Sequence, residues 1–210
     1  MVGGLTLLLV VAWGGWRFGG TIFPRIEGWI VAGPAPNESA SVPSQEIADD
    51  ALARFNSFRV GSSGDSVFSL TDLELTSIVR HALPGLMPDG VRDATVEVGE
   101  DRILLSARVA LDAFSEIAAV RDVSAFLPDT VQIEMTSSLL RLDAHHAALV
   151  VDGVTAAGMP LPDRLIPDIL SALGRTERPG LPSTALALPL PPGIGRAYTA
   201  EGALVFESTE

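Results

Sequence analysis

The sequence predicts an α+β fold, in which an N-terminal single transmembrane helix is followed by a curved antiparallel sheet packed with two main helices. Three observations carry this prediction. The first 23 residues are almost entirely apolar, two later stretches repeat apolar residues at helical spacing, and much of the remaining chain alternates apolar and polar residues. Runs of strands with segregated helices indicate an antiparallel sheet covered by helices on one face.

The apolar segment Met1–Phe23 carries one charge, Arg17, and Pro24 ends it. As a helix it would be about 34 Å long, enough to cross a hydrocarbon core of about 30 Å. The alternative is a cleavable signal peptide, but such a peptide has a basic start and a small-residue cleavage site, and neither is found here. We therefore expect residues 1–24 to be a retained transmembrane anchor.

Glycine and tryptophan are the characteristic residues of this anchor. Small residues let helices approach closely in lipid, and tryptophan is favoured at the membrane–water interface. The pattern predicts that the anchor packs against other integral membrane subunits. The residues expected to do so are Gly3, Gly4, Trp13, Gly14, Gly15, Trp16, Gly19, Gly20 and Trp29.

Residues 25–66 are expected to be a linker that contains a short helix. The stretch Ala32–Ser44 is rich in proline and serine, which is typical of an extended spacer. Apolar residues recur at helical spacing within Gln45–Phe58, and this favours a short helix lying on the domain. Residues 67–210 then form the predicted α+β domain.

The domain begins with a predicted helix over 71–83, because Thr71 and Glu74 form a capping-box pattern and Pro84 ends the apolar periodicity. The elements expected after it are a hairpin over 91–111, a strand pair over 130–142 and 147–156, a helix over 163–173 and two short strands over 196–208. Residues 113–127 fit either a helix or a strand with a crossing loop.

Composition excludes several classes of function. The formal net charge is −12, and such a surface repels phosphate backbones, so we expect no nucleic-acid partner. The chain has no cysteine, which excludes disulfides, thiolate metal sites and cysteine nucleophiles. It also has no lysine, which excludes Schiff-base chemistry and a P-loop lysine.

No pattern of reactive residues indicates catalysis. His145 and His146 are adjacent, so on a strand they would point to opposite faces and could not both bind one metal ion. Each close pair of carboxylates lies at a helix start or in a turn, where solvent or the helix dipole accounts for it. These pairs are Asp49 with Asp50, Asp72 with Glu74, and Glu100 with Asp101. We expect no enzyme, no cofactor and no metal site.

The apolar stripes of the two predicted helices allow two interpretations. Such stripes are usually buried core, but they are also what lines a groove for a lipid. The residues concerned are Leu73, Ile78, Val79, Leu83, Leu165, Ile166, Ile169 and Leu170.

Three stretches together carry a resemblance to a known family. They are FSLTDLELTSIVRHALPG, VRDATVEVGEDRILLSARVAL and GVTAAGMPLPDRLIPDILSALG, the last a strand that passes through glycine and two prolines into an amphipathic helix. In this order they resemble the bacterial tubular lipid-binding (TULIP-like) proteins and their anchored extracytoplasmic relatives, over about residues 67–208. The resemblance implies a highly curved sheet around a long helix, enclosing an apolar groove for acyl chains. It assigns no individual binding residue.

Two functions from different classes follow. The first is a structural accessory subunit of a larger bacterial membrane complex, for which a photosynthetic reaction centre with its antenna is one candidate host. The second is an anchored protein that binds or transfers a lipid in the cell envelope. We expect the bacterial inner membrane and a periplasmic C-terminal domain, as the acidic domain and the resemblance favour. Arg17 and Arg25 lie on the C-terminal side of the anchor and argue for the opposite orientation.

Overall fold

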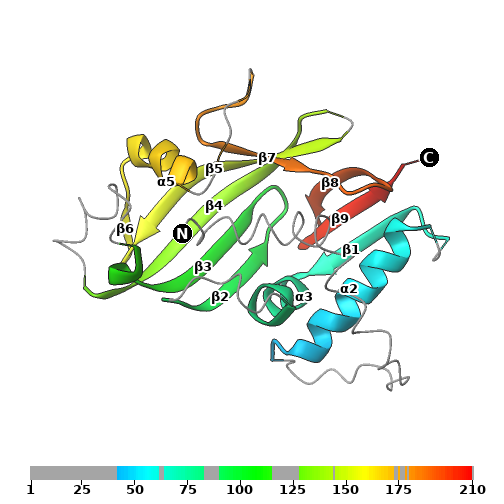
Figure 1. Cartoon of the computed structure of the whole chain (residues 1–210), viewed down its shortest axis with the longest axis horizontal. Helices are drawn as coiled ribbons and strands as arrows, with labels where there is room; N and C mark the ends of the chain where they lie inside the picture. The colour runs from blue at the N-terminus through cyan, green and yellow to red at the C-terminus, as the bar shows by residue number, and fades with distance from the viewer. Residues whose placement is uncertain are drawn as a thin grey trace.

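Two antiparallel sheets form the frame of the domain (Figure 1). The computed structural model describes residues 42–209 apart from 62–63, 83–89, 115–127, 144, 173–174, 176–177 and 179. The small sheet has the strand order β1-β9-β8. The large sheet has the order β2-β3-β4-β5-β6, and β7 also pairs with β5.

The strands of the two sheets have the following bounds. Those of the small sheet are β1 (Val67–Thr71), β8 (Ile194–Ala200) and β9 (Ala203–Ser208). Those of the large sheet are β2 (Val91–Val98), β3 (Ile103–Ala110), β4 (Thr130–Arg141), β5 (His146–Ala156), β6 (Met159–Pro160) and β7 (Ala185–Pro189). The expected hairpin over 91–111 is confirmed as β2 and β3, and the longer pair as β4 and β5.

The helical segments are short. They are α2 (Gln45–Arg59), α3 (Asp72–Ser77), the π-helical turn η2 (Ile78–Ala82), the 3-10 turns η3 (Leu111–Phe114) and η4 (Asp163–Leu165), and α5 (Ile166–Ala172). Because η2 continues α3 without a break, we refer to Asp72–Ala82 as the central helix. It lies beside β2, whereas α2 lies over the small sheet and α5 over the far side of the large sheet (Figure 1).

Most apolar residues of the described chain divide between two cores, and Ala148, Leu181 and Ala185 form a smaller third cluster. The large core lies on one face of the large sheet, and the small core lies between α2 and the small sheet. The buried members of the small core are Ala48, Ala51, Phe58, Leu70, Ile78, Ile194, Ala197 and Phe206. Four phenylalanine rings, from Phe55, Phe58, Phe68 and Phe206, pack against one another there with centroids 5.0–6.5 Å apart. This arrangement holds α2 on the sheet.

The expected α+β class with one curved sheet and two main helices is wrong. The described part of the chain is mostly antiparallel sheet with few helices, and its strands form two sheets. The physical reason is a pairing between distant segments: β1 pairs with β9 from Val67↔Glu207 to Thr71↔Ala203. Local alternation predicts that a segment is a strand but does not identify its partner, so the second sheet was not expected.

The expected fold class also included a transmembrane helix at residues 1–24. Among the residues that the structure describes, none of the helices combines the length and the apolar character that crossing a bilayer requires. Residues 1–24 themselves lie outside the described residues.

Candidate functional site

The central helix contacts strand β2, helix α2, and both the large and the small core. A capping box begins it: Thr71 accepts a hydrogen bond from the backbone N–H of Glu74, and the Glu74 carboxylate accepts one from the backbone N–H of Thr71. Such reciprocal bonds satisfy N–H groups that otherwise have no partner in the first turn. The capping box predicted from the sequence is therefore confirmed, and it fixes the point where β1 becomes helix.

One polar face of the central helix binds the outer edge of strand β2. Asp72, Thr76 and Arg80 are four residues apart, which places them on the same face of a helix. The bonds are Val98 N–H to Asp72 Oδ1 (2.7 Å), Val96 N–H to Thr76 Oγ1 (3.0 Å), Thr76 Oγ1–H to the Val96 carbonyl (3.2 Å) and Arg80 Nε–H to the Ala94 carbonyl (2.5 Å). Side chains of a helix here take the place of a neighbouring strand.

The apolar faces of the same helix enter both cores. Val79 is 3% exposed and belongs to the large core, whereas its neighbour Ile78 is 2% exposed and belongs to the small core. Leu75 packs against both. Because consecutive residues of a helix point about 100° apart, one helix can separate and join two cores in this way.

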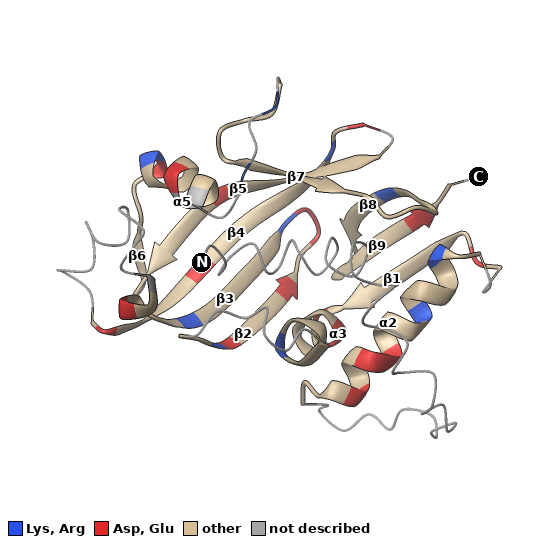
Figure 2. Cartoon of the chain, in the orientation of Figure 1, with Lys and Arg blue, Asp and Glu red and all other residues tan. Residues whose placement is uncertain are grey.

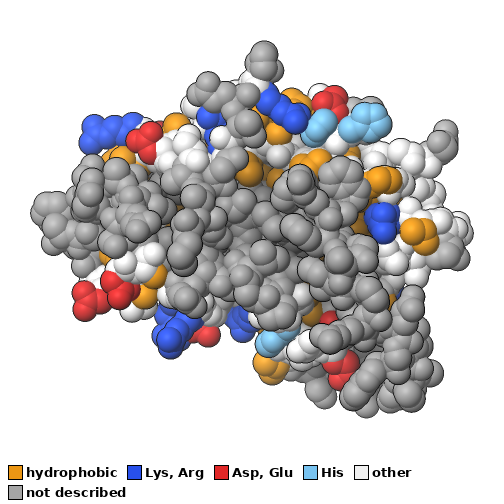
Figure 3. All heavy atoms as spheres, in the orientation of Figure 1, with side chains coloured by type: hydrophobic (Ala, Val, Ile, Leu, Met, Phe, Trp, Pro, Cys, Tyr) orange, Lys and Arg blue, Asp and Glu red, His pale blue; other side chains and the backbone are white. Residues whose placement is uncertain are grey.

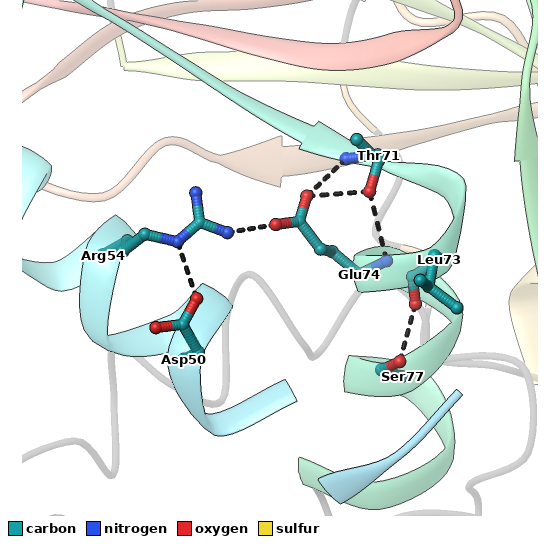
Figure 4. A network of polar contacts seen from close by, with 6 residues as sticks. All are labelled: Asp50, Arg54, Thr71, Leu73, Glu74 and Ser77. Carbon is teal, nitrogen blue, oxygen red and sulfur yellow. Dashed lines mark hydrogen bonds and ion pairs between the residues drawn. The ribbon is translucent and has the colours of Figure 1, made fainter. Parts of the chain in front are cut away.

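A third face of the central helix holds α2 (Figure 4). Arg54 of α2 donates to Asp50 one turn earlier (2.9 Å) and forms an ion pair with Glu74. Burial lowers the pKa of the Arg54 guanidinium, but its bonds with Asp50 and Glu74 outweigh this and raise the pKa above its ordinary value. The backbone N–H of Ser44, the N-cap of α2, donates to the hydroxyl of buried Ser77 (3.2 Å).

The residues expected to line an apolar groove are divided by the structure. Val79 from the central helix and Ile166 and Leu170 from α5 come together in the large core, and the last two are each 2% exposed. Ile78 lies in the small core, and Leu73 and Leu165 are half-buried. Leu83 and the side chain of Ile169 lie outside the described part of the chain. The prediction that these residues line a groove stays a prediction.

The residues expected to pack the membrane anchor, from Gly3 to Trp29, all lie outside the described residues. Nothing in the structure bears on that prediction.

The two adjacent histidines lie at the turn between β4 and β5. His146 Nδ1 lies 2.8 Å from Oδ1 of Asp143, and the backbone N–H of exposed His145 donates to the same oxygen (2.7 Å). The N–H of His145 and then the ring of His146 lower the pKa of the Asp143 carboxyl. Among the described residues, no group of three or more His, Asp or Glu side chains is arranged to hold a metal ion.

The sequence did not reveal that Asp72 acts on another strand. Its position at a helix start suggested only a favourable interaction with the helix dipole, yet its carboxylate accepts the Val98 N–H. The spacing of Asp72, Thr76 and Arg80 was a visible signal, because three polar residues on one helix face need partners when that face is covered. Within the described residues, every buried side-chain nitrogen and oxygen has such a partner.

Comparison with known proteins adds no identification: no family model, no curated protein and no solved structure matches this chain.

Proposed function

We propose that this chain is a non-enzymatic accessory subunit of a bacterial membrane complex, and that its β-rich domain lies on the extracytoplasmic surface of that complex. The observation that carries the proposal is how the central helix is used. Its polar faces bind β2 and α2, and its apolar faces fill two cores. One helix thereby joins both sheets and α2 of the described domain, which suits a protein that acts through its surface.

Part of the face of the large sheet that points away from the large core is a suitable contact surface; Ala148, opposite Leu140 on this face, is itself buried with Leu181 and Ala185. Arg108, Gln132, Glu134 and Leu140 are exposed there, and Leu140 is 53% exposed. Antiparallel sheets often keep one face on the core and the other toward solvent. Figure 2 shows long stretches of these strands without charged residues, although Arg108 and Glu134 lie within β3 and β4.

The apolar residues 1–23 support the membrane location of the proposed subunit. Their glycine and tryptophan content suits close packing within lipid and interfacial seating. The formal net charge of −12 disfavours direct binding of the domain to anionic headgroups, so protein contacts are the better candidate for holding it in place.

A second candidate function is lipid binding, and one observation favours it. Two helices far apart in the sequence bring Val79, Ile166 and Leu170 to the same face of the large sheet. The central helix packs on β2 at one side of this face, and α5 packs on β5 and β7 at the other. Apolar side chains of β3 and β4, including Leu105 and Met135, lie between these sides. These side chains are buried, so an acyl chain would have to enter between the helices and the sheet.

Mild detergent extraction of the tagged full chain from the membranes of its own bacterium tests both candidates. An accessory subunit co-purifies with integral membrane proteins in fixed stoichiometry. Leu140→Glu should reduce that yield about tenfold. Val67→Glu is the matched control, because Val67 is 51% exposed but lies on the small sheet.

The results of this experiment distinguish the two candidates. A chain that runs as a free monomer in detergent overturns the subunit proposal. A stoichiometric lipid in that monomer, identified by mass spectrometry and lost in Leu170→Trp, would support the second candidate. A lipid-free monomer contradicts both.

A further inference from the structure

Strand β2 is an outer strand of the large sheet. It pairs with β3 on one side, and among the described strands none lies on its other side. Four backbone groups point to that other side: the carbonyl of Ala94, the N–H and carbonyl of Val96, and the N–H of Val98. All four are bound by side chains of the central helix, which Figure 1 shows beside this edge.

These four groups fit most of the bonding pattern of a second β2 strand. In an antiparallel ladder, two residues that face each other in a hydrogen-bonded pair exchange both N–H to carbonyl bonds, and such pairs recur at every second residue. If a second copy of β2 ran antiparallel with Val96 opposite Val96, the two Val96 residues would exchange two bonds. The Val98 N–H of each copy would donate to the Ala94 carbonyl of the other, and the Ala94 N–H of each would donate to the Val98 carbonyl of the other.

We infer that the central helix occupies the position of a second copy of β2, and that this edge is a latent two-fold docking site for another copy of this chain. Unpaired strand edges readily pair with other strands unless something covers them. Here the cover is a set of side chains from a helix, and β2 of a second copy would bond the same four groups in their place.

The side chains of β2 agree with this register. Ala94, Val96 and Val98 are 3–6% exposed and point to the large core, so the apolar rows of two copies would continue one another on one face. On the other face, Glu97 would lie opposite Thr95 of the second copy. No like charges would therefore face each other directly, which in a sheet would be destabilising.

The native chain keeps the edge closed because the central helix also has apolar contacts. Leaving the edge would remove Leu75 and Val79 from the large core, in addition to breaking the four hydrogen bonds. The docked state therefore requires the bonds between the helix and β2 to be weakened. Thr76→Val weakens them with little change of shape, because valine fills the same space but cannot bond the Val96 backbone.

Disulfide trapping tests the inference directly, since the chain contains no cysteine of its own. In the proposed register, residues 95 and 97 of the two copies form a non-hydrogen-bonded pair with Cα atoms about 4.5 Å apart. That distance falls in the range that a disulfide spans. Full-length Thr95→Cys and Glu97→Cys chains, carrying different tags, are mixed in detergent micelles and oxidised.

We expect little mixed disulfide when the helix is otherwise unchanged, and about tenfold more when both chains also carry Thr76→Val. Asp72→Ala added to Thr76→Val should raise the yield further. Ser77→Ala is the matched control: it changes the same helix but removes a contact with α2 instead of β2, so the yield should not rise. Circular dichroism verifies that each variant is folded, and Thr76→Val alone decides the question if the double variant is not.

Three results would overturn the inference. The first is a yield that does not rise in folded Thr76→Val. The second is an equal rise in Ser77→Ala. The third is cross-linking of Thr95→Cys with itself as efficiently as with Glu97→Cys, because contact in the proposed register favours the mixed pair.

Discussion

The central helix and α5 have similar apolar stripes but different roles in the structure. The central helix contacts β2, α2 and both cores, whereas α5 packs on β5 and β7 and contributes to the large core alone. Their polar residues account for the difference. Asp72, Glu74, Thr76, Ser77 and Arg80 all bond to other segments or cap the central helix. The entry to α5 follows Pro162, which makes no side-chain capping bond. The apolar stripe of a helix thus places it on a core, and its polar residues decide which other segments it contacts.

Truncating one buried residue in each helix should reveal the difference between the two helices most clearly. Ile78→Ala and Leu170→Ala should each lower the free energy of unfolding by about 2–5 kcal/mol, because each removes a buried side chain and leaves a cavity. Only Ile78→Ala should loosen α2, since Ile78 packs in the small core with Phe58.

Chemical denaturation measures the two free energies, and limited proteolysis within residues 42–61 measures the loosening of α2. Equal protection of α2 in both variants would contradict the proposed role of the central helix as a link between the two cores.

Removing the N-cap of the central helix should have an intermediate effect. Thr71→Ala should cost about 1 kcal/mol, which is typical for the loss of a capping side chain. Ser44→Ala, which removes the N-cap of α2, is the matched comparison. Because the central helix joins more segments, thermal denaturation should show a larger decrease in Tm for Thr71→Ala. A larger decrease in Tm for Ser44→Ala would instead show that the N-cap of α2 contributes more to stability than that of the central helix.

The smallest expected effect concerns the surface ion pair. Arg54→Ala should cost less than about 1 kcal/mol, because the side chain is 45% exposed and ion pairs of this kind are weak. Arg164→Ala, at the exposed entry to α5, should have an effect within about 0.5 kcal/mol. Raising the salt concentration should reduce the cost of Arg54→Ala, because salt screens the attraction to Glu74. A cost independent of salt would instead point to the packing of Arg54 over the Phe68 ring.

Local features of the fold could be predicted from the sequence. The capping box at Thr71 and Glu74, the hairpin of β2 and β3, and the long pair of β4 and β5 are visible as short-range patterns, and the structure confirms them. Each depends on residues that are close in the chain, so a window of a few residues contains most of the signal.

The fold class and the contacts of the central helix could not be predicted in the same way. The ladder between β1 and β9 joins distant segments, and nothing within Val67–Thr71 identifies its partner. Likewise, the role of Asp72 depends on the presence of the Val98 N–H in front of it. Figure 3 shows acidic side chains in red and arginines in blue at the surface, toward the edge of the molecule in this view.

The pairing of β1 with β9 has a consequence for how the chain reaches its structure. Phe68 and Phe206, partners in this ladder, are separated by nearly the whole of the domain. Bringing such distant residues together requires closure of a long loop, which slows folding relative to that of local hairpins. The hairpins of the large sheet are therefore expected to form early. The surface that receives α2 is completed late, and until then the phenylalanine side chains that will hold that helix remain accessible to solvent.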